Sequence, residues 1–206
     1  GGRSPIEECG LVTCWRFAGR GFEVALDPIR LAAAVADYCV SGQSWNWDGV
    51  RFEFLHPGVN SHSDPATKDN DRSCVLHVTG PYGSALLSAD IERSSEQHLL
   101  RRLGAGLKSD VLLAPHHGSR TSSTPAFLHA VAPEFIVIPV GHRNRFGHPH
   151  PLVSARYRNL QSRVLRTDVD GAILIRIASS GIEAQGWRDV RRRYWHDSSP
   201  GVEQAW

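Results

Sequence analysis

Acidic, histidine and amide side chains follow four apolar runs of this sequence that are short enough to be strands. In chain order these side chains are Asp90, His116, His117, Asn144, His148 and Asp168. Open α/β sheets place their sites at the carboxyl ends of strands. Carboxylates and imidazoles are ligands for Zn²⁺ or Mn²⁺, and the Gly118–Ser119 turn offers donors for a phosphate. The pattern predicts that Asp90, both adjacent histidines and His148 converge in one cleft.

Each of these side chains also has an ordinary structural interpretation. Asp90 could cap a helix that starts two residues later, and a histidine pair in a loop is usually solvated. Asn144 and His148 could simply hold a turn, and Asp168 with Asp170 before a glycine is typical of a β-turn. The combination of these residues at successive strand ends, rather than any single one, favours a site.

Alternating strands and helices must position these residues. The sequence predicts strands over residues 11–17, 22–26, 50–56, 74–79, 85–88, 110–114, 135–140, 164–167, 172–177 and 182–187, and helices over residues 27–38, 92–103, 125–131 and 151–160. Hairpins followed by strand–helix–strand units indicate an α/β sandwich rather than a β-barrel. Trp45 and Trp47 lie two residues apart and share one face of a strand or hairpin, where core packing is favoured over a base-stacking role.

Composition limits the class of protein and suggests a partner. The chain has 206 residues, of which 41% are apolar and 21% charged, which suits a globular domain and excludes fibrous and wholly disordered chains. Residues 1–100 carry a net charge of −5 and residues 101–206 a net charge of +7, and 21 of the 23 basic residues are arginine. This basic second half fits a phosphate-bearing partner, although GC-rich codon usage also enriches arginine.

The four cysteines are Cys9, Cys14, Cys39 and Cys74, and their spacing does not match a zinc ribbon. Four unpaired thiols, or one or two disulfides in an oxidising compartment, are both compatible with the sequence.

The candidate side chains occur within an ordered series of motifs. The series reads Asp69-Asn-Asp-Arg-Ser-Cys, Leu86-Leu-Ser-Ala-Asp-Ile-Glu, Leu113-Ala-Pro-His-His-Gly-Ser, Asn144-Arg-Phe-Gly-His-Pro and Arg166-Thr-Asp-Val-Asp-Gly. It resembles the C-terminal metallo-β-lactamase-like domain of ComEC-type DNA internalisation proteins of natural competence, in their proteobacterial branch. The resemblance covers residues 39–196 and leaves residues 1–38 poorly matched and 197–206 as a frayed tail.

The resemblance implies an α/β fold of the αββα metallo-β-lactamase-like sandwich type, incomplete at its N-terminal side. It further implies a metal-dependent phosphodiesterase or nuclease that acts on the non-transported DNA strand at the periplasmic face of the inner membrane. Carried over by residue, Asp90 and His117 match the metal ligands for Mn²⁺ or Zn²⁺, and the catalytic positions are His116, His148 and Asn144. The matching substrate-binding residues are Asn70, Ser73, Ser119, Arg143 and Arg145. The expected partners are single-stranded DNA and the remainder of a membrane channel protein.

The family's main histidine motif has no counterpart upstream, because residues 1–38 contain no histidine. The chain is therefore expected to bind metal poorly and to have impaired activity, and a catalytically inactive DNA-binding or structural module is the alternative. A metallo-hydrolase for a small phosphodiester is a third hypothesis. If the domain faces the periplasm, a Cys39–Cys74 disulfide is expected. Weak DNA binding is expected through Arg143, Arg145, Arg156, Arg158 and Arg163.

Overall fold

The computed structural model describes residues 38–191. The strands expected over residues 11–17 and 22–26, nearly all of the helix expected over residues 27–38 and the expected tail lie outside these residues.

Seven strands form one sheet in which the spatial order follows the chain order, β1 to β7. The antiparallel part comprises β1 (Ser44–Trp47), β2 (Val50–His56), β3 (Val75–Gly80) and β4 (Gly83–Leu87), and the parallel part adds β5 (Val111–Leu113), β6 (Phe135–Ile138) and β7 (Arg163–Arg166). Asp48 and Gly49, both with positive φ, make the tight hairpin between β1 and β2. The parallel pairs need longer crossovers, and each crossover contains a helix.

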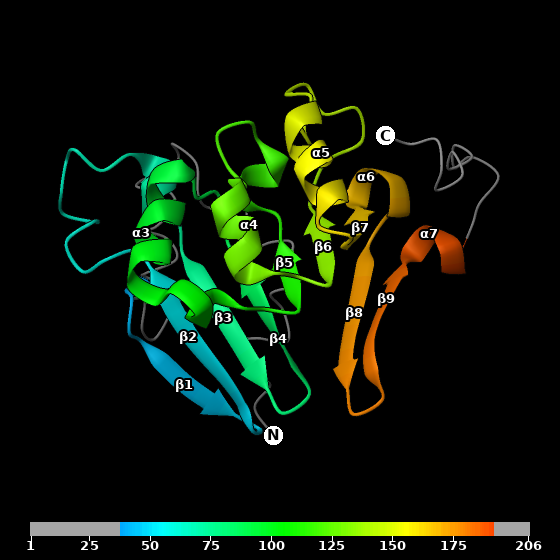
Figure 1. Cartoon of the computed structure of the whole chain (residues 1–206), viewed down its shortest axis with the longest axis horizontal. Coiled ribbons are helices and arrows are strands. Elements are labelled where there is room, and N and C mark those ends of the chain that lie inside the picture. Colours follow the sequence, from blue (N-terminus) through cyan, green and yellow to red (C-terminus); the bar gives the residue numbers. More distant parts are fainter. Residues whose placement is uncertain (1–37, 192–206) are drawn as a thin grey trace, which may run out of the picture.

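Three helices cover one face of this sheet (Figure 1). They are α3 (Arg93–Leu103), α4 (Pro125–Val131) and α5 (Pro151–Asn159). Three 3₁₀ turns lie elsewhere in the connecting segments: η2 (Asp69–Arg72) before β3, η3 (Gly104–Leu107) after α3 and η4 (Pro115–Gly118) after β5. The core beneath them is fully buried and includes Leu86, Leu112 and Ile136 from the strands, with Phe127 and Tyr157 from the helices. The expected α/β class is confirmed.

A separate hairpin of β8 (Ile173–Ala178) and β9 (Gly181–Gly186) packs on the other face, and α6 (Thr167–Asp170) and α7 (Trp187–Val190) flank it. Ile173, Ile175 and Ile177 contact a small apolar cluster that includes Val111 and Phe135. Because neighbouring strand residues point to opposite faces, residues next to the core leucines reach this second cluster.

The expectation that Trp45 and Trp47 pack in the core is wrong. Trp45 is 42% exposed and Trp47 is 46% exposed. Trp45 stacks on Phe52 with ring centroids 5.1 Å apart, and it also contacts Phe54. Among the described residues, the apolar cluster beneath the β8–β9 hairpin draws on β4 to β7 of the sheet, so β1 gains no cover from it.

Two further expectations concern the strand ends. The β-turn expected at Asp168 and Asp170 is instead the helical turn α6, in which Asp168 forms a bidentate pair with Arg166 and Asp170 accepts the Arg166 backbone N–H at 2.6 Å. These two carboxylates therefore stabilise the turn. Asp90 does not cap α3, because the N-cap position is Glu92 and no side chain caps it.

The expected Cys39–Cys74 disulfide is confirmed, with a Cα–Cα distance of 5.9 Å. It joins the segment before β1 to the residue that precedes β3, and so it fixes one side of the loop that carries η2. Within residues 38–191 there is no helix of the length and apolarity needed to cross a bilayer.

Candidate functional site

The loops at one edge of the sheet bring the predicted site residues together. The strands β4 to β7 run parallel, so the segments after Leu87, Leu113 and Ile138 all leave the sheet at this edge. The strand β3 runs antiparallel to β4, so the segment before Val75, which contains η2, reaches the same edge. Residues spread over about two fifths of the chain therefore surround one place.

Asp90 and His117 form one of two carboxylate–imidazole pairs of the site. The distance between Asp90 Oδ1 and His117 Nε2 is 3.5 Å, and both side chains are partly exposed. His117 Nδ1 lies 2.7 Å from the Pro139 carbonyl oxygen. A carbonyl only accepts hydrogen bonds, so Nδ1 carries the proton and donates it. In the neutral ring, Nε2 and the Asp90 oxygen are then two acceptors that face each other, an arrangement that a proton or a cation between them would stabilise.

His116 lies beside this pair and points to a second carboxylate. Its Nδ1 is 3.3 Å from Glu92 Oε1, an ion-pair separation without hydrogen-bond geometry. Glu92 Oε1 also accepts hydrogen bonds from Thr121 Oγ1 at 2.9 Å and from Asn70 Nδ2 at 3.2 Å. The backbone of His116 donates to the Ala89 carbonyl at 2.9 Å, which joins the loop after β5 to the loop after β4.

The backbone around the two histidines is unusual. His116 and His117 have φ values of 47° and 56°, in the left-handed region that side chains with a Cβ adopt at a cost of about 1–3 kcal/mol each. Gly118 follows with φ 78°, and a Cβ added there would lie 2.7 Å from Pro149 Cβ. The motif therefore requires glycine at this position, and the strained turn directs both imidazoles to the site.

Asn144 and His148 form a closed loop after β6. Asn144 Nδ2 donates to the His148 carbonyl at 2.7 Å, and the His148 N–H donates to Asn144 Oδ1 at 2.8 Å. The His148 ring lies 6.0 Å from the His116 ring between centroids, and its buried Nδ1 has no hydrogen-bond partner within the described part of the chain. Burial, followed by the neighbouring histidines His116 and His117, lowers the pKa of His148, so its ring is neutral at pH 7.

The predicted substrate-binding residues occupy different places at this edge. Asn70 reaches the site through Glu92, whereas Ser119 is buried and shares a hydrogen bond with Thr121. Ser73 is buried next to the disulfide, and its hydroxyl has no hydrogen-bond partner among residues 38–191. Arg143 and Arg145 are exposed in the loop after β6.

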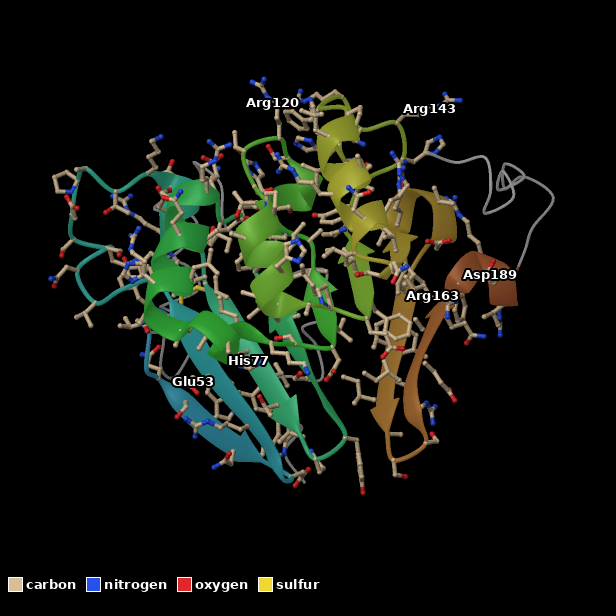
Figure 2. All side chains as sticks on the ribbon, in the orientation of Figure 1. Glu53, His77, Arg120, Arg143, Arg163 and Asp189 are labelled. Atoms are coloured by element: carbon tan, nitrogen blue, oxygen red, sulfur yellow. A yellow bond between two sulfur atoms is a disulfide. The ribbon has the colours of Figure 1, made fainter. Side chains whose placement is uncertain are left out.

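The arginines expected to bind DNA do not all share this edge. Figure 2 shows Arg120 and Arg143 at the end of the molecule where the loops after β5 and β6 lie, with Arg163 well away from them. Arg163 starts β7, and its guanidinium lies over the Phe135 ring. Arg156 donates to the Ser122 and Ser123 carbonyls, so it stabilises the loop after η4. Arg163 and Arg158 are exposed, and DNA binding through these arginines stays a prediction.

Sequence reasoning missed Glu92 and Thr121 as parts of the site. Glu92 seemed only an acidic residue at a helix start, yet it joins Asn70, Thr121 and His116 in one cluster. The Asp90-Ile-Glu spacing is the signal that could have identified it, since it places a second carboxylate two residues after the first.

The four residues predicted to converge do so, but the part of the chain that the structure describes does not contain a full ligand set. Among residues 38–191, no group of three or more histidine, cysteine, aspartate and glutamate side chains is arranged to hold a metal ion. Catalytic zinc sites usually have three protein ligands and a water. The Asp90–His117 pair has the right donor types, yet the described residues alone do not fit a metal centre.

Comparisons with known proteins place this site in a wider context. The chain is 40% identical over 160 residues to competence protein ComA of Neisseria gonorrhoeae, which is 78% of this chain and 22% of that protein. It is 35% identical over 148 residues to recombination protein 2 of Haemophilus influenzae, 72% of this chain and 18% of that protein. It is 36% identical over 127 residues to ComE operon protein 3 of Bacillus subtilis, 62% of this chain and 16% of that protein.

The chain thus spans about a fifth of the length of these curated relatives. A scan against protein-family models finds none that matches. These three relatives, of which one is titled a competence protein and one a recombination protein, support the relationship of this chain to the ComEC family.

Proposed function

We propose that residues 39–196 are the metallo-β-lactamase-like domain of a ComEC-type DNA-uptake protein, and that its site engages a phosphodiester of single-stranded DNA. In the complete protein the site would hydrolyse the non-transported strand with divalent cations. The observation that carries the proposal is the Asp90–His117 pair, in which the Pro139 carbonyl orients the imidazole. Metal-binding histidines are typically held in this way, with the second ring nitrogen donating to a carbonyl or carboxylate.

The surroundings of the pair support an anionic substrate. His116 and His148 lie beside it, and a neutral, partly buried imidazole such as that of His148 can donate or accept a hydrogen bond. Arg120, Arg143 and Arg145 are exposed on the same loops, where their guanidinium groups can approach phosphate oxygens.

This chain by itself is expected to have impaired hydrolytic activity. Two protein ligands are fewer than a catalytic metal ion needs, and the described residues supply no third. We therefore assign to this chain no chemical step that depends on a metal, and propose that its residues bind and orient DNA.

A catalytically inactive DNA-binding or structural module is the second candidate. A different observation favours it, because the site lacks a complete donor set among residues 38–191 while Arg120, Arg143 and Arg145 on its loops are exposed. We propose the periplasmic face of the inner membrane as the location, and the Cys39–Cys74 disulfide supports it because disulfides persist in oxidising compartments. The remainder of a membrane channel protein would be the partner.

The experiment that tests these proposals measures binding and cleavage on the same preparation. The purified chain is incubated with fluorescent single-stranded DNA, first in EDTA and then with Mn²⁺ or Zn²⁺, beside Asp90→Ala and His129→Ala. His129 is exposed on α4 and serves as the matched control.

We expect binding that weakens steeply with salt, because phosphate contacts release counterions, and little or no cleavage with either metal. Robust cleavage that disappears in Asp90→Ala and persists in His129→Ala would show a complete metal site and contradict the expected impairment. An absence of DNA binding at low salt would contradict the first proposal and the DNA-binding form of the second, and would leave a structural module as the candidate.

A further inference from the structure

The loop after β6 presents an aromatic ring to solvent at the edge of the site. Phe146 is 68% exposed, although phenylalanine is among the residue types most often buried. Residues 141–150 contain two arginines and three histidines and no acidic residue. The surface around Phe146 is therefore both apolar at its centre and favourable to negative charge.

The ring is held in place and is not simply a side chain on a loose loop. The two hydrogen bonds between Asn144 and His148 close the loop across Phe146, and the Gly147 N–H donates to the Asn144 carbonyl at 3.4 Å. The His150 N–H donates to the Gly118 carbonyl at 2.9 Å, which ties the end of the loop to the histidine motif. Such a preorganised ring loses little conformational freedom when a ligand stacks on it.

Phe146 is the outer member of a row of rings that leads into the site. Its ring centroid lies 5.9 Å from that of His148 with an interplanar angle of 18°, and the His148 ring lies 6.0 Å from that of His116. The guanidinium carbon of Arg145 lies 4.9 Å from the Phe146 centroid. A flat ligand on the exposed part of Phe146 would thus lie close to a cation and to the site histidines.

We propose that Phe146 stacks on an unpaired base of single-stranded DNA, while the adjoining phosphate lies toward His148 and His116. This inference rests on the proposed function, and it adds that the site selects single strands by contact with an unpaired base. Base stacking on aromatic rings does not depend on sequence, because every base has a flat π-face. In a duplex those faces are covered by neighbouring bases, so an exposed ring favours single strands.

The test measures the affinity of the full chain for a fluorescent oligothymidylate in EDTA, by anisotropy and at several salt concentrations. The variants are Phe146→Ala, Phe146→Tyr and Arg143→Ala. The matched control is Tyr82→Ala, because Tyr82 is 58% exposed and lies in the β3–β4 turn, away from the strand ends that carry the site. A second probe of equal length and charge carries abasic sugars in place of bases.

We expect Phe146→Ala to weaken binding of the oligothymidylate about 5- to 150-fold, the range for loss of one stacked base, with an unchanged salt slope. Phe146→Tyr should retain binding because the ring remains, and Arg143→Ala should reduce the salt slope by about 1. The abasic probe should bind weakly to the unaltered chain, and its affinity should not change in Phe146→Ala.

The possible failures of the two proposals are distinct. If the unaltered chain binds no single-stranded DNA, the proposed function fails, and the stacking role fails with it. If the chain binds DNA but Phe146→Ala matches Tyr82→Ala, or weakens the abasic probe as much as the oligothymidylate, the stacking role is overturned while DNA binding stands. A preference for duplex over single strands of equal length would also overturn it.

Discussion

Removal of the Cys39–Cys74 disulfide is expected to destabilise the domain without disturbing its sheet. The bridge spans 35 positions in sequence, and closing a loop of that size in the unfolded chain is worth about 3 to 4 kcal/mol in the chain-entropy model. With a urea m-value of about 2 kcal/mol/M, the midpoint of unfolding should fall by about 1.5 to 2 M. Cys39 lies before β1 and Cys74 before β3, so neither cysteine is part of a strand. Removal of the bridge should therefore act by freeing the unfolded chain and the loop that carries η2, and should leave the sheet intact.

The assay is urea unfolding of the oxidised chain and of the double variant Cys39→Ser, Cys74→Ser, each with and without a reductant. The reductant should lower the stability of the unaltered chain to that of the variant and should leave the variant unchanged. A difference below about 0.5 kcal/mol between oxidised and reduced chain would refute the reasoning, since the model gives several times more. A further loss in the reduced variant would place a second bridge elsewhere in the chain.

Four other substitutions test the packing of the domain. Gly118→Ala should lower the free energy of unfolding by about 2 to 4 kcal/mol, because φ is positive and the added Cβ meets Pro149. Gly147→Ala, where φ is also positive but nothing lies within 4 Å, should cost less in the same urea titration. Glu96→Ala should lower the free energy of unfolding by about 2 to 4 kcal/mol, because this fully buried side chain accepts backbone N–H groups at the start of α4. An unchanged free energy in thermal or urea unfolding would contradict that role. Burial lowers the pKa of His56 below 6.5, so the contribution of the neutral ring to stability is present above pH 6.5 and is lost as the pH falls. Between pH 7.5 and 5.5 the free energy of unfolding should therefore fall more in the unaltered chain than in His56→Gln. Equal losses in the two proteins would contradict this.

The sequence carried most of the information about the elements that hold the site. The alternation over residues 50–56 and the apolar spacing over residues 125–131 predicted β2 and α4 to the residue. Placing polar residues after apolar strands predicted that Asp90, His117 and His148 meet, because parallel strands end at a common edge. These are consequences of local periodicity and sheet geometry, which a single sequence expresses directly.

Other features depend on contacts that local patterns do not encode. The side chain of Arg156 on α5 turns to the carbonyls of the loop after η4, so its charge does not contribute to an open basic surface. Exposure of Trp45 depends on how far the β8–β9 hairpin extends over the sheet, and no residue near Trp45 specifies that distance. The role of Glu92 depends on Asn70 and Thr121, which lie 22 and 29 positions away.

The most direct test of the account is a carbon–proton NMR titration of the imidazole groups with single-stranded oligothymidylate in EDTA. The account predicts that the resonances of His116, His117 and His148 shift as DNA saturates the chain. The resonances of His77 should remain unchanged, because His77 lies on β3 beside Ser109, away from the strand ends that carry the site (Figure 2). DNA binding that leaves the three site histidines unshifted, or that shifts His77 as strongly, would contradict the assignment of this edge as the DNA site.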